Sequence, residues 1–189
     1  GLPVQKELHY WTTVRQPGAS HWWPRVTFEI EKMERWGLGA RLLRGPGRRR
    51  HDRSWHLADA MYRDTAPGHR AYADTLFQAW HGEPVVGEIT PDYAYLRAEV
   101  FAEMAALHPD VRFVYIMRDP IDRLVSALRM SMRRAVRNDA PRIAELPFEE
   151  RLEAAASDPE ERNLVLSQYD RTIARLESVV APERIGYFF

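Results

Sequence analysis

The stretch FVYIMRDPIDRLVSALR, residues 113–129, joins an apolar segment to a helical pattern through a charged pair and a proline. Five apolar residues lead into Arg118 and Asp119, and Pro120 follows them. Aspartate is a preferred helix N-cap, and proline suits the first helical position because no backbone N–H is needed there. The stretch therefore predicts a buried strand, VRFVYIM (111–117), followed by a helix that begins at Pro120.

This junction also has the composition of an anion site. Arg118 would lie at the carboxyl end of the strand, where ligands bind in open α/β sheets. Ser126 follows Asp119 by seven residues, almost two helical turns, so the two share one helical face. An arginine fork and a hydroxyl beside a helix N-terminus suit an anion, most naturally a phosphate. On this spacing alone, the alternative is a capped surface helix with a solvated arginine.

Strand and helix patterns alternate on both sides of the junction. They predict strands over residues 5–11, 84–89, 111–117 and 183–189, and helices after Pro24 and over residues 69–80, 93–108, 120–136, 147–156 and 159–180. Ser157 and Glu160 have the spacing of a capping box for the last helix. Strands that alternate with helices predict an α/β domain of three layers, with a mainly parallel sheet flanked by helices.

Length and composition narrow the classes of function. The 189 residues suit a single domain, and Lys+Arg and Asp+Glu number 27 each, so no global field draws the chain to nucleic acid. The absence of cysteine excludes thiolate zinc sites and cysteine catalysis, and the seven histidines lack metal-ligand spacing, so we expect no metal. No apolar run approaches the roughly 18 residues of a membrane span, so we expect no membrane segment.

A second candidate site lies near the start of the chain. In KELHYW (6–11), period-two spacing places Glu7 and His9 on one face of the predicted strand, where they could share one substrate oxygen. The alternative is a solvated glutamate and a packed histidine. In GEITPDYAYL (87–96), the same spacing puts Glu88 and Thr90 on one strand face.

Four segments in this order carry a family resemblance. The series KELHYW, GEITPDYAYL, FVYIMRDPIDRLVSA and SQYDRTIARLESVVAPERI, the last with Ser167 and Tyr169 on a predicted helix, resembles the sulfotransferases that use 3′-phosphoadenosine 5′-phosphosulfate (PAPS). The likeness is to bacterial members and to the branch that acts on glycans. It implies an α/β fold of the P-loop nucleotide-hydrolase type. It also implies transfer of a sulfuryl group, without a metal, to a hydroxyl or amine of a carbohydrate or small-molecule acceptor.

The resemblance also assigns roles to particular residues. The glutamate of the family's K-E-x-H pattern is the base, so Glu7 is expected to be the general base and His9 its helper. The arginine and serine of the R-D-P-x-x-R-x-x-S pattern hold the 3′-phosphate of the donor, so Arg118 and Ser126 are expected to bind that phosphate.

The chain departs from the family in three ways. The loop that binds the 5′-phosphosulfate lies upstream of K-E-x-H in the family, and the late glycine-rich donor loop follows the last strand; neither is present here. Thr12 and Ile89 stand where some glycan enzymes carry Asp and Lys. Residues 13–69 are unmatched and are interpreted as a variable acceptor or lid region. We therefore expect residues 1–189 to be an incomplete single domain, truncated at both ends and inactive in isolation.

Two other functions stay open at this point. A P-loop kinase shares the architecture and also uses arginines on helices. A non-catalytic module could bind RNA or another polyanion through RGPGRRRHDR, residues 44–53, although the zero net charge speaks against a nucleic-acid partner. We expect a cytoplasmic, bacterial protein; the sequence leaves open an anchor upstream of Gly1.

Overall fold

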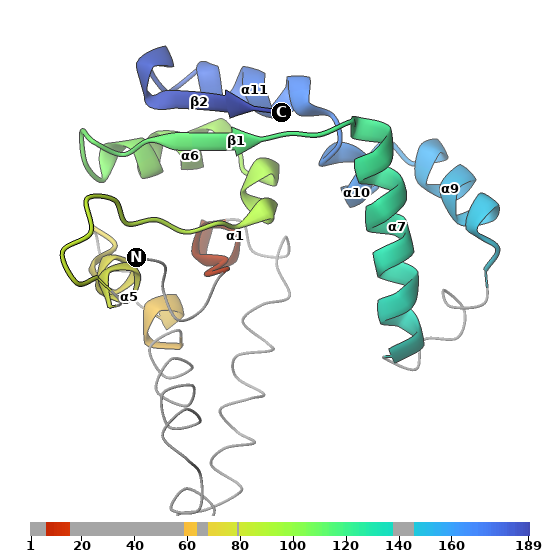
Figure 1. Ribbon diagram of the computed structural model, residues 1–189, viewed down its shortest axis with the longest axis horizontal. Coiled ribbons are helices and arrows are strands. Elements are labelled where there is room, and N and C mark those ends of the chain that lie inside the picture. The colour runs from red at the N-terminus through yellow and green to blue at the C-terminus, as the bar shows by residue number, and fades with distance from the viewer. Residues whose placement is uncertain (1–6, 16–58, 64–67, 79, 138–145) are drawn as a thin grey trace, which may run out of the picture. The chain divides into compact units, whose positions relative to one another are not determined.

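The computed structural model describes residues 7–15, 59–63, 68–78, 80–137 and 146–189 (Figure 1). The chain divides into two compact units, residues 1–96 and 97–189. The described residues form a mixed α/β structure that is mostly helical and has a two-stranded parallel sheet. The expected α/β class is confirmed at this level, and the expected helix after Pro24 lies outside the described residues.

The parallel sheet belongs to the second unit. Strand β1 (Phe113–Ile116) pairs in parallel with β2 (Ile185–Phe188), and the backbone N–H of Met117 extends the pairing by donating to the Phe188 carbonyl at 2.7 Å. Both predicted strands are confirmed, with shorter bounds. Because the strands are parallel, their carboxyl ends meet at the same edge of the sheet (Figure 1).

One face of the sheet is covered and the other is exposed. The Phe113 ring contacts Phe101 of α6 (Ala98–Ala106), and the Tyr115 ring contacts Tyr169 of α11 (Tyr169–Glu177). Two alternate side chains of β1 point the other way and are 64% (Val114) and 68% (Ile116) exposed. The prediction of a fully buried strand is therefore wrong, because within these residues the helices cover a single face.

Helix α7 (Pro120–Arg137) begins where the sequence predicts it. The Asp119 carboxylate accepts hydrogen bonds from the backbone N–H groups of Ile121 and Asp122, both at 2.9 Å, which satisfies two donors of the first turn. The Asp119 carbonyl accepts the first helical bond, from Arg123 N–H at 2.9 Å. The strand, the cap and the helix of residues 113–129 are confirmed together.

The C-terminal helical region differs in part from its prediction. Helix α9 (Phe148–Ser157) is confirmed, but residues 159–180 form two helices, α10 (Arg162–Val165) and α11. The proposed capping box is wrong: the Ser157 hydroxyl donates to the Glu153 carbonyl at 2.8 Å and so belongs to the end of α9. Glu161 caps α10 instead, accepting from Asn163 N–H at 3.2 Å.

Arg184 ties the approach to β1 to the approach to β2. This residue ends the 3₁₀ helix η2 (Pro182–Arg184), directly before β2. Its guanidinium donates to the carbonyl of Ala105 at the end of α6, at 2.8 Å, and to two carbonyls between α6 and β1, Val111 at 2.9 Å and His108 at 3.0 Å. A single side chain thereby satisfies carbonyls that the end of α6 and its turn leave without helical partners.

The first unit has no strand among its described residues. It contains α1 (Tyr10–Arg15), a helical segment over residues 59–63, α5 (Arg70–Phe77) and the 3₁₀ helix η1 (Pro91–Tyr95). The predicted strand over residues 84–89 is wrong, since this segment has no regular secondary structure. The predicted helix over residues 93–108 is also wrong as one element, because Leu96 and Arg97 are extended and separate η1 from α6.

The predicted strand over residues 5–11 is wrong for the part that is described, residues 7–11. His9 has a φ of 52°, in the left-handed region, and turns the chain into α1, whose first residue is Tyr10. Leu8, Tyr10 and Trp11 are all buried, a spacing that period-two alternation does not allow. Tyr10 stacks on Tyr72 with ring centroids 4.7 Å apart, so burial in an aromatic core replaces the expected sheet pairing.

Candidate functional site

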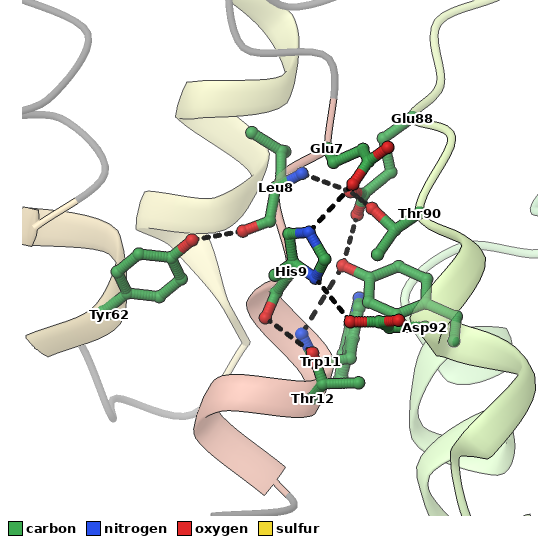
Figure 2. Close-up of polar contacts among 10 residues, drawn as sticks. Glu7, Leu8, His9, Trp11, Thr12, Tyr62, Glu88, Thr90 and Asp92 are labelled. Atoms are coloured by element: carbon green, nitrogen blue, oxygen red, sulfur yellow. Dashed lines mark hydrogen bonds and ion pairs between the residues drawn. The ribbon is translucent and has the colours of Figure 1, made fainter. Parts of the chain in front are cut away.

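Glu7 and His9 lie together, as predicted, although not through strand geometry. The left-handed turn at His9 brings its imidazole Nε2 to 3.0 Å from the Glu7 Oε2 (Figure 2). The His9 side chain is only 9% exposed, whereas the Glu7 side chain is 39% exposed. The pair therefore offers a carboxylate that a molecule in solution can reach, supported from behind by a buried imidazole.

A second carboxylate faces the other nitrogen of the same ring. Asp92, in η1, places its Oδ2 3.2 Å from His9 Nδ1, with the Asp92 side chain 25% exposed (Figure 2). Burial lowers the pKa of His9, but Asp92 and then Glu7 outweigh this effect and leave the pKa raised above its usual value. His9 thus favours the protonated, cationic form between two anions.

Glu88 is the centre of a polar cluster beside this pair. Its carboxylate accepts hydrogen bonds from the hydroxyls of Tyr72 and Tyr93, both at 2.7 Å, from the Thr90 hydroxyl at 2.8 Å and from the Leu8 backbone N–H at 3.2 Å. Burial raises the pKa of Glu88 despite these four donors, each of which lowers it. Burial and the nearby Glu88 charge also raise the pKa of both tyrosines, so both hydroxyls stay protonated and able to donate.

Residues near Glu88 hold the segment around His9 in place through hydrogen bonds and an ion pair. Glu88 holds the backbone of Leu8, Asp92 faces the His9 ring, and the Tyr93 hydroxyl accepts from Trp11 N–H at 3.5 Å. The Leu8 carbonyl also accepts from the Tyr62 hydroxyl. The Glu7–His9 geometry is therefore fixed by contacts with residues at least 54 positions away in the sequence, and all of these partners lie in the first unit.

The predicted phosphate ligands, Arg118 and Ser126, lie in the second unit. Arg118 lies two residues before α7, and Ser126 lies within the first two turns of that helix. Arg118 follows β1 at the carboxyl end of the strand pair, and its guanidinium reaches the carbonyls of Asp122 at 3.3 Å and Arg123 at 3.4 Å. Those carbonyls lie one turn before Ser126, and both Arg118 and Ser126 are exposed. The arrangement suits an anion of phosphate size, because a cation, a hydroxyl and a capped helix N-terminus share one surface.

The next arginine of the motif has a structural task. Arg123 donates to the Asn163 carbonyl at 2.9 Å and to the Ser167 hydroxyl at 3.0 Å, which fastens α7 to the α10 region. The Ser167 hydroxyl itself donates to the Asn163 carbonyl at 2.8 Å. This explains part of the segment that begins at Ser167, and it holds the helix that presents Arg118 and Ser126.

Sequence patterns did not identify three of the residues that surround Glu7, His9 and Glu88. Asp92 carries no signal beyond being an acid after Pro91 in the quoted GEITPDYAYL segment. Tyr72 and Tyr93 looked like ordinary positions on predicted helices. Glu88 and Thr90 were placed on a common face, and the 2.8 Å bond between them is consistent with that grouping, although the segment is not a strand.

No group of three or more His, Asp or Glu side chains in the described part of the chain could hold a metal ion. Across those same residues, no helix combines the length and the apolar character needed to cross a bilayer. Comparison of the chain with family models, curated proteins and solved structures found no match.

Proposed function

We propose that this chain is part of a PAPS-dependent sulfotransferase of the P-loop nucleotide-hydrolase type, acting on a hydroxyl or amine of a carbohydrate or small molecule. The observation that carries the proposal is the Glu7–His9 pair, in which an accessible carboxylate is held 3.0 Å from a buried imidazole. Sulfuryl transfer to an alcohol needs a group of this kind to accept the proton that the acceptor oxygen loses.

In the proposed reaction the acceptor oxygen forms a bond to sulfur while the bond between sulfur and the 5′-phosphate oxygen breaks. The acceptor proton passes to Glu7, and the bond electrons leave with adenosine 3′,5′-bisphosphate. His9 donates its Nε2–H to Glu7 Oε2 and so orients the carboxylate. PAPS supplies the sulfuryl group, and the protein supplies the base and the grip on the donor.

Support for the donor site comes from the β1–α7 junction. A 3′-phosphate carries up to two negative charges, which suit the Arg118 guanidinium and the N-terminal end of α7. The Asp119 cap occupies the Ile121 and Asp122 amides, so we assign the phosphate to the side of the helix that carries Ser126. The residues present therefore fit the 3′ end of the donor.

The test of the general-base role is the substitution Glu7→Gln in the full-length protein. With ³⁵S-labelled PAPS and a panel of oligosaccharides and simple alcohols, kcat should fall by about 10²–10⁴, the usual contribution of a general base. The affinity for adenosine 3′,5′-bisphosphate should stay nearly constant. Glu99→Gln, an exposed carboxylate on α6, is the matched control and should leave kcat unchanged.

Three results would contradict this assignment. If the Glu7→Gln variant keeps most of its turnover while the His9→Ala variant loses it, His9 would be the general base and Glu7 the residue that orients it. Transfer from γ-labelled ATP in place of PAPS would make the protein a kinase. Turnover of neither donor in a folded protein as encoded would overturn the enzyme proposal itself.

A further inference from the structure

His9 lies between two carboxylates, one at each ring nitrogen. Nε2 is 3.0 Å from Glu7 Oε2, and Nδ1 is 3.2 Å from Asp92 Oδ2 (Figure 2). A neutral imidazole has one N–H donor and one lone pair, so in either tautomer one carboxylate would face a lone pair. Only the imidazolium, with a proton on each nitrogen, suits both neighbours.

The ring is also held in place by its backbone. The His9 carbonyl accepts from Thr13 N–H and from the Thr12 hydroxyl, both at 3.0 Å, at the start of α1. On the preceding residue, Leu8 N–H donates to Glu88. With the main chain fixed on both sides and the side chain 9% exposed, the ring has little freedom to reorient, so its hydrogen-bond direction depends on which nitrogens carry protons.

The charged and titratable groups around His9 come from three of the described ranges, residues 7–15, 68–78 and 80–137. Glu7 and Asp92 face the ring directly. Glu88 accepts a hydrogen bond from the backbone N–H of Leu8, the residue before His9. The hydroxyls of Tyr72 on α5 and Tyr93 on η1 donate to Glu88. The two tyrosines are neutral donors in the physiological range, so carboxylates dominate the field at the ring.

We propose that Asp92 is a positioning residue for Glu7, acting through His9. The Asp92 carboxylate, 3.2 Å from Nδ1, favours a proton on that nitrogen and a cationic ring, so that Nε2 carries a hydrogen toward Glu7 Oε2 and orients that carboxylate. Asp92 also partly cancels the imidazolium charge beside Glu7. The assignment rests on the proposed function only in its use of Glu7 as the base.

Removal of the Asp92 charge has a clear consequence. Asp92→Asn removes one of the two carboxylates that face the buried imidazolium, so less negative charge opposes the desolvation that already lowers the pKa of His9. The ring would deprotonate at lower pH than in the parent protein. Once neutral, it can present a lone pair to Glu7, and the carboxylate would lose its fixed orientation.

The first arm of the test is an NMR titration and needs no turnover. The His9 ring resonances, assigned by their loss in His9→Gln, are followed across pH in the parent, Asp92→Asn and Asp92→Glu. We expect the midpoint to fall in Asp92→Asn and to stay raised in Asp92→Glu, which keeps the charge. Asp74→Asn, an exposed aspartate of the same unit with its side chain 70% exposed, should leave the midpoint unchanged.

The second arm measures sulfuryl transfer. Asp92→Asn should lower kcat by about 10²-fold, the scale of a misplaced catalytic group, with the KM for PAPS unchanged. The alkaline limb of its pH profile should move to lower pH, since the imidazolium is lost earlier, and Asp92→Glu should recover part of kcat. Far-UV circular dichroism establishes that each variant is folded.

The two arms separate the failure of this inference from the failure of the proposed function. An unmoved His9 midpoint in folded Asp92→Asn overturns the inference whatever the activity. A midpoint that falls while kcat and the pH profile stay as in the parent overturns the positioning role. A midpoint that falls in a protein with no sulfuryl transfer bears out the Asp92–His9 coupling and overturns the proposed function instead.

Discussion

Glu88 is a half-buried carboxylate whose four donors do not fully offset its desolvation. Its two oxygens divide the donors, with Tyr72 and Tyr93 on Oε1 and Thr90 and Leu8 N–H on Oε2. A glutamine at this position has only one acceptor oxygen, and its amide nitrogen cannot accept from the Leu8 N–H. The substitution Glu88→Gln therefore separates two effects on the free energy of unfolding: the loss of one acceptor oxygen and the loss of the buried negative charge.

Glu88→Gln should change the pH dependence of stability in a defined direction. At acid pH, where Glu88 is protonated in both states, the variant should be less stable by about 1–3 kcal/mol, the cost of a buried donor without an acceptor. The folded pKa of Glu88 is raised, so its ionisation destabilises the native state as pH rises from the unfolded pKa through the folded one. The difference between parent and variant should therefore shrink over that window.

Urea unfolding of both proteins at a series of pH values measures this difference. Most other titrating groups cancel because they are common to both proteins. A difference that grows as pH rises would mean that the folded pKa of Glu88 lies below its unfolded value, contrary to the burial argument.

Arg118 carries the donor prediction at the same scale. In the full-length protein, Arg118→Ala should weaken the binding of adenosine 3′,5′-bisphosphate. The expected loss is roughly 1.5–3 kcal/mol, the range for a hydrogen bond to a charged group. Ser126→Ala should cost less. Arg112→Ala is the matched control, because Arg112 is exposed at the opposite end of β1. Calorimetry measures all three, and unchanged affinity in both Arg118→Ala and Ser126→Ala would contradict the phosphate assignment.

Helix α7 is the element in which local sequence and structure agree most closely. Its cap and its first residue follow from residues adjacent in the chain: Asp119 supplies the cap and Pro120 starts the helix. Leu128, on the same helix, is fully buried. Arg123 then fastens the helix to the segment near Ser167. The element thus presents Arg118 and Ser126 on a scaffold fixed at its N-terminal end and again within its first turns.

The cap gives a prediction for this element. Asp119→Ala leaves the Ile121 and Asp122 amides without their shared acceptor and should cost about 1 kcal/mol of unfolding free energy. Asp119→Asn, which retains a capping oxygen, should cost less and serves as the matched variant. Urea unfolding measures both. Equal losses in the two variants would show that the negative charge at the helix N-terminus, and not the hydrogen bonds, stabilises the start of α7.

For the whole molecule, the balance of 27 basic and 27 acidic residues predicts weak attraction to polyanions. Anisotropy with a labelled single-stranded RNA should show binding no tighter than the non-specific range of about 10⁻⁴–10⁻⁶ M at physiological salt, without a steep salt dependence. The triple variant Arg48→Ser, Arg49→Ser, Arg50→Ser should behave like the parent. Tight, strongly salt-dependent binding that this variant abolishes would favour the polyanion-binding alternative.

Local order in this chain could be read from the residues because its causes are local. The apolar run before Arg118, the Asp119 cap and the proline at the first helical position act within one or two turns, and they correctly predicted β1 and α7. The same holds for α9 and β2. It fails where a local pattern has two readings, as at Ser157, whose hydroxyl bonds backwards to Glu153 and so does not cap the next helix.

The Glu7–His9 pair could be foreseen as a pair, but its geometry could not. Period-two spacing assumed a neighbouring strand, and the chain satisfies residues 7–11 with side chains instead: Glu88 and Tyr62 bond the Leu8 backbone, and Tyr93 accepts from Trp11. These partners are 54 to 82 residues away, and Asp92 joins them from η1. Long-range burial selects such contacts, because a polar group removed from water takes whichever partner the folded chain brings to it.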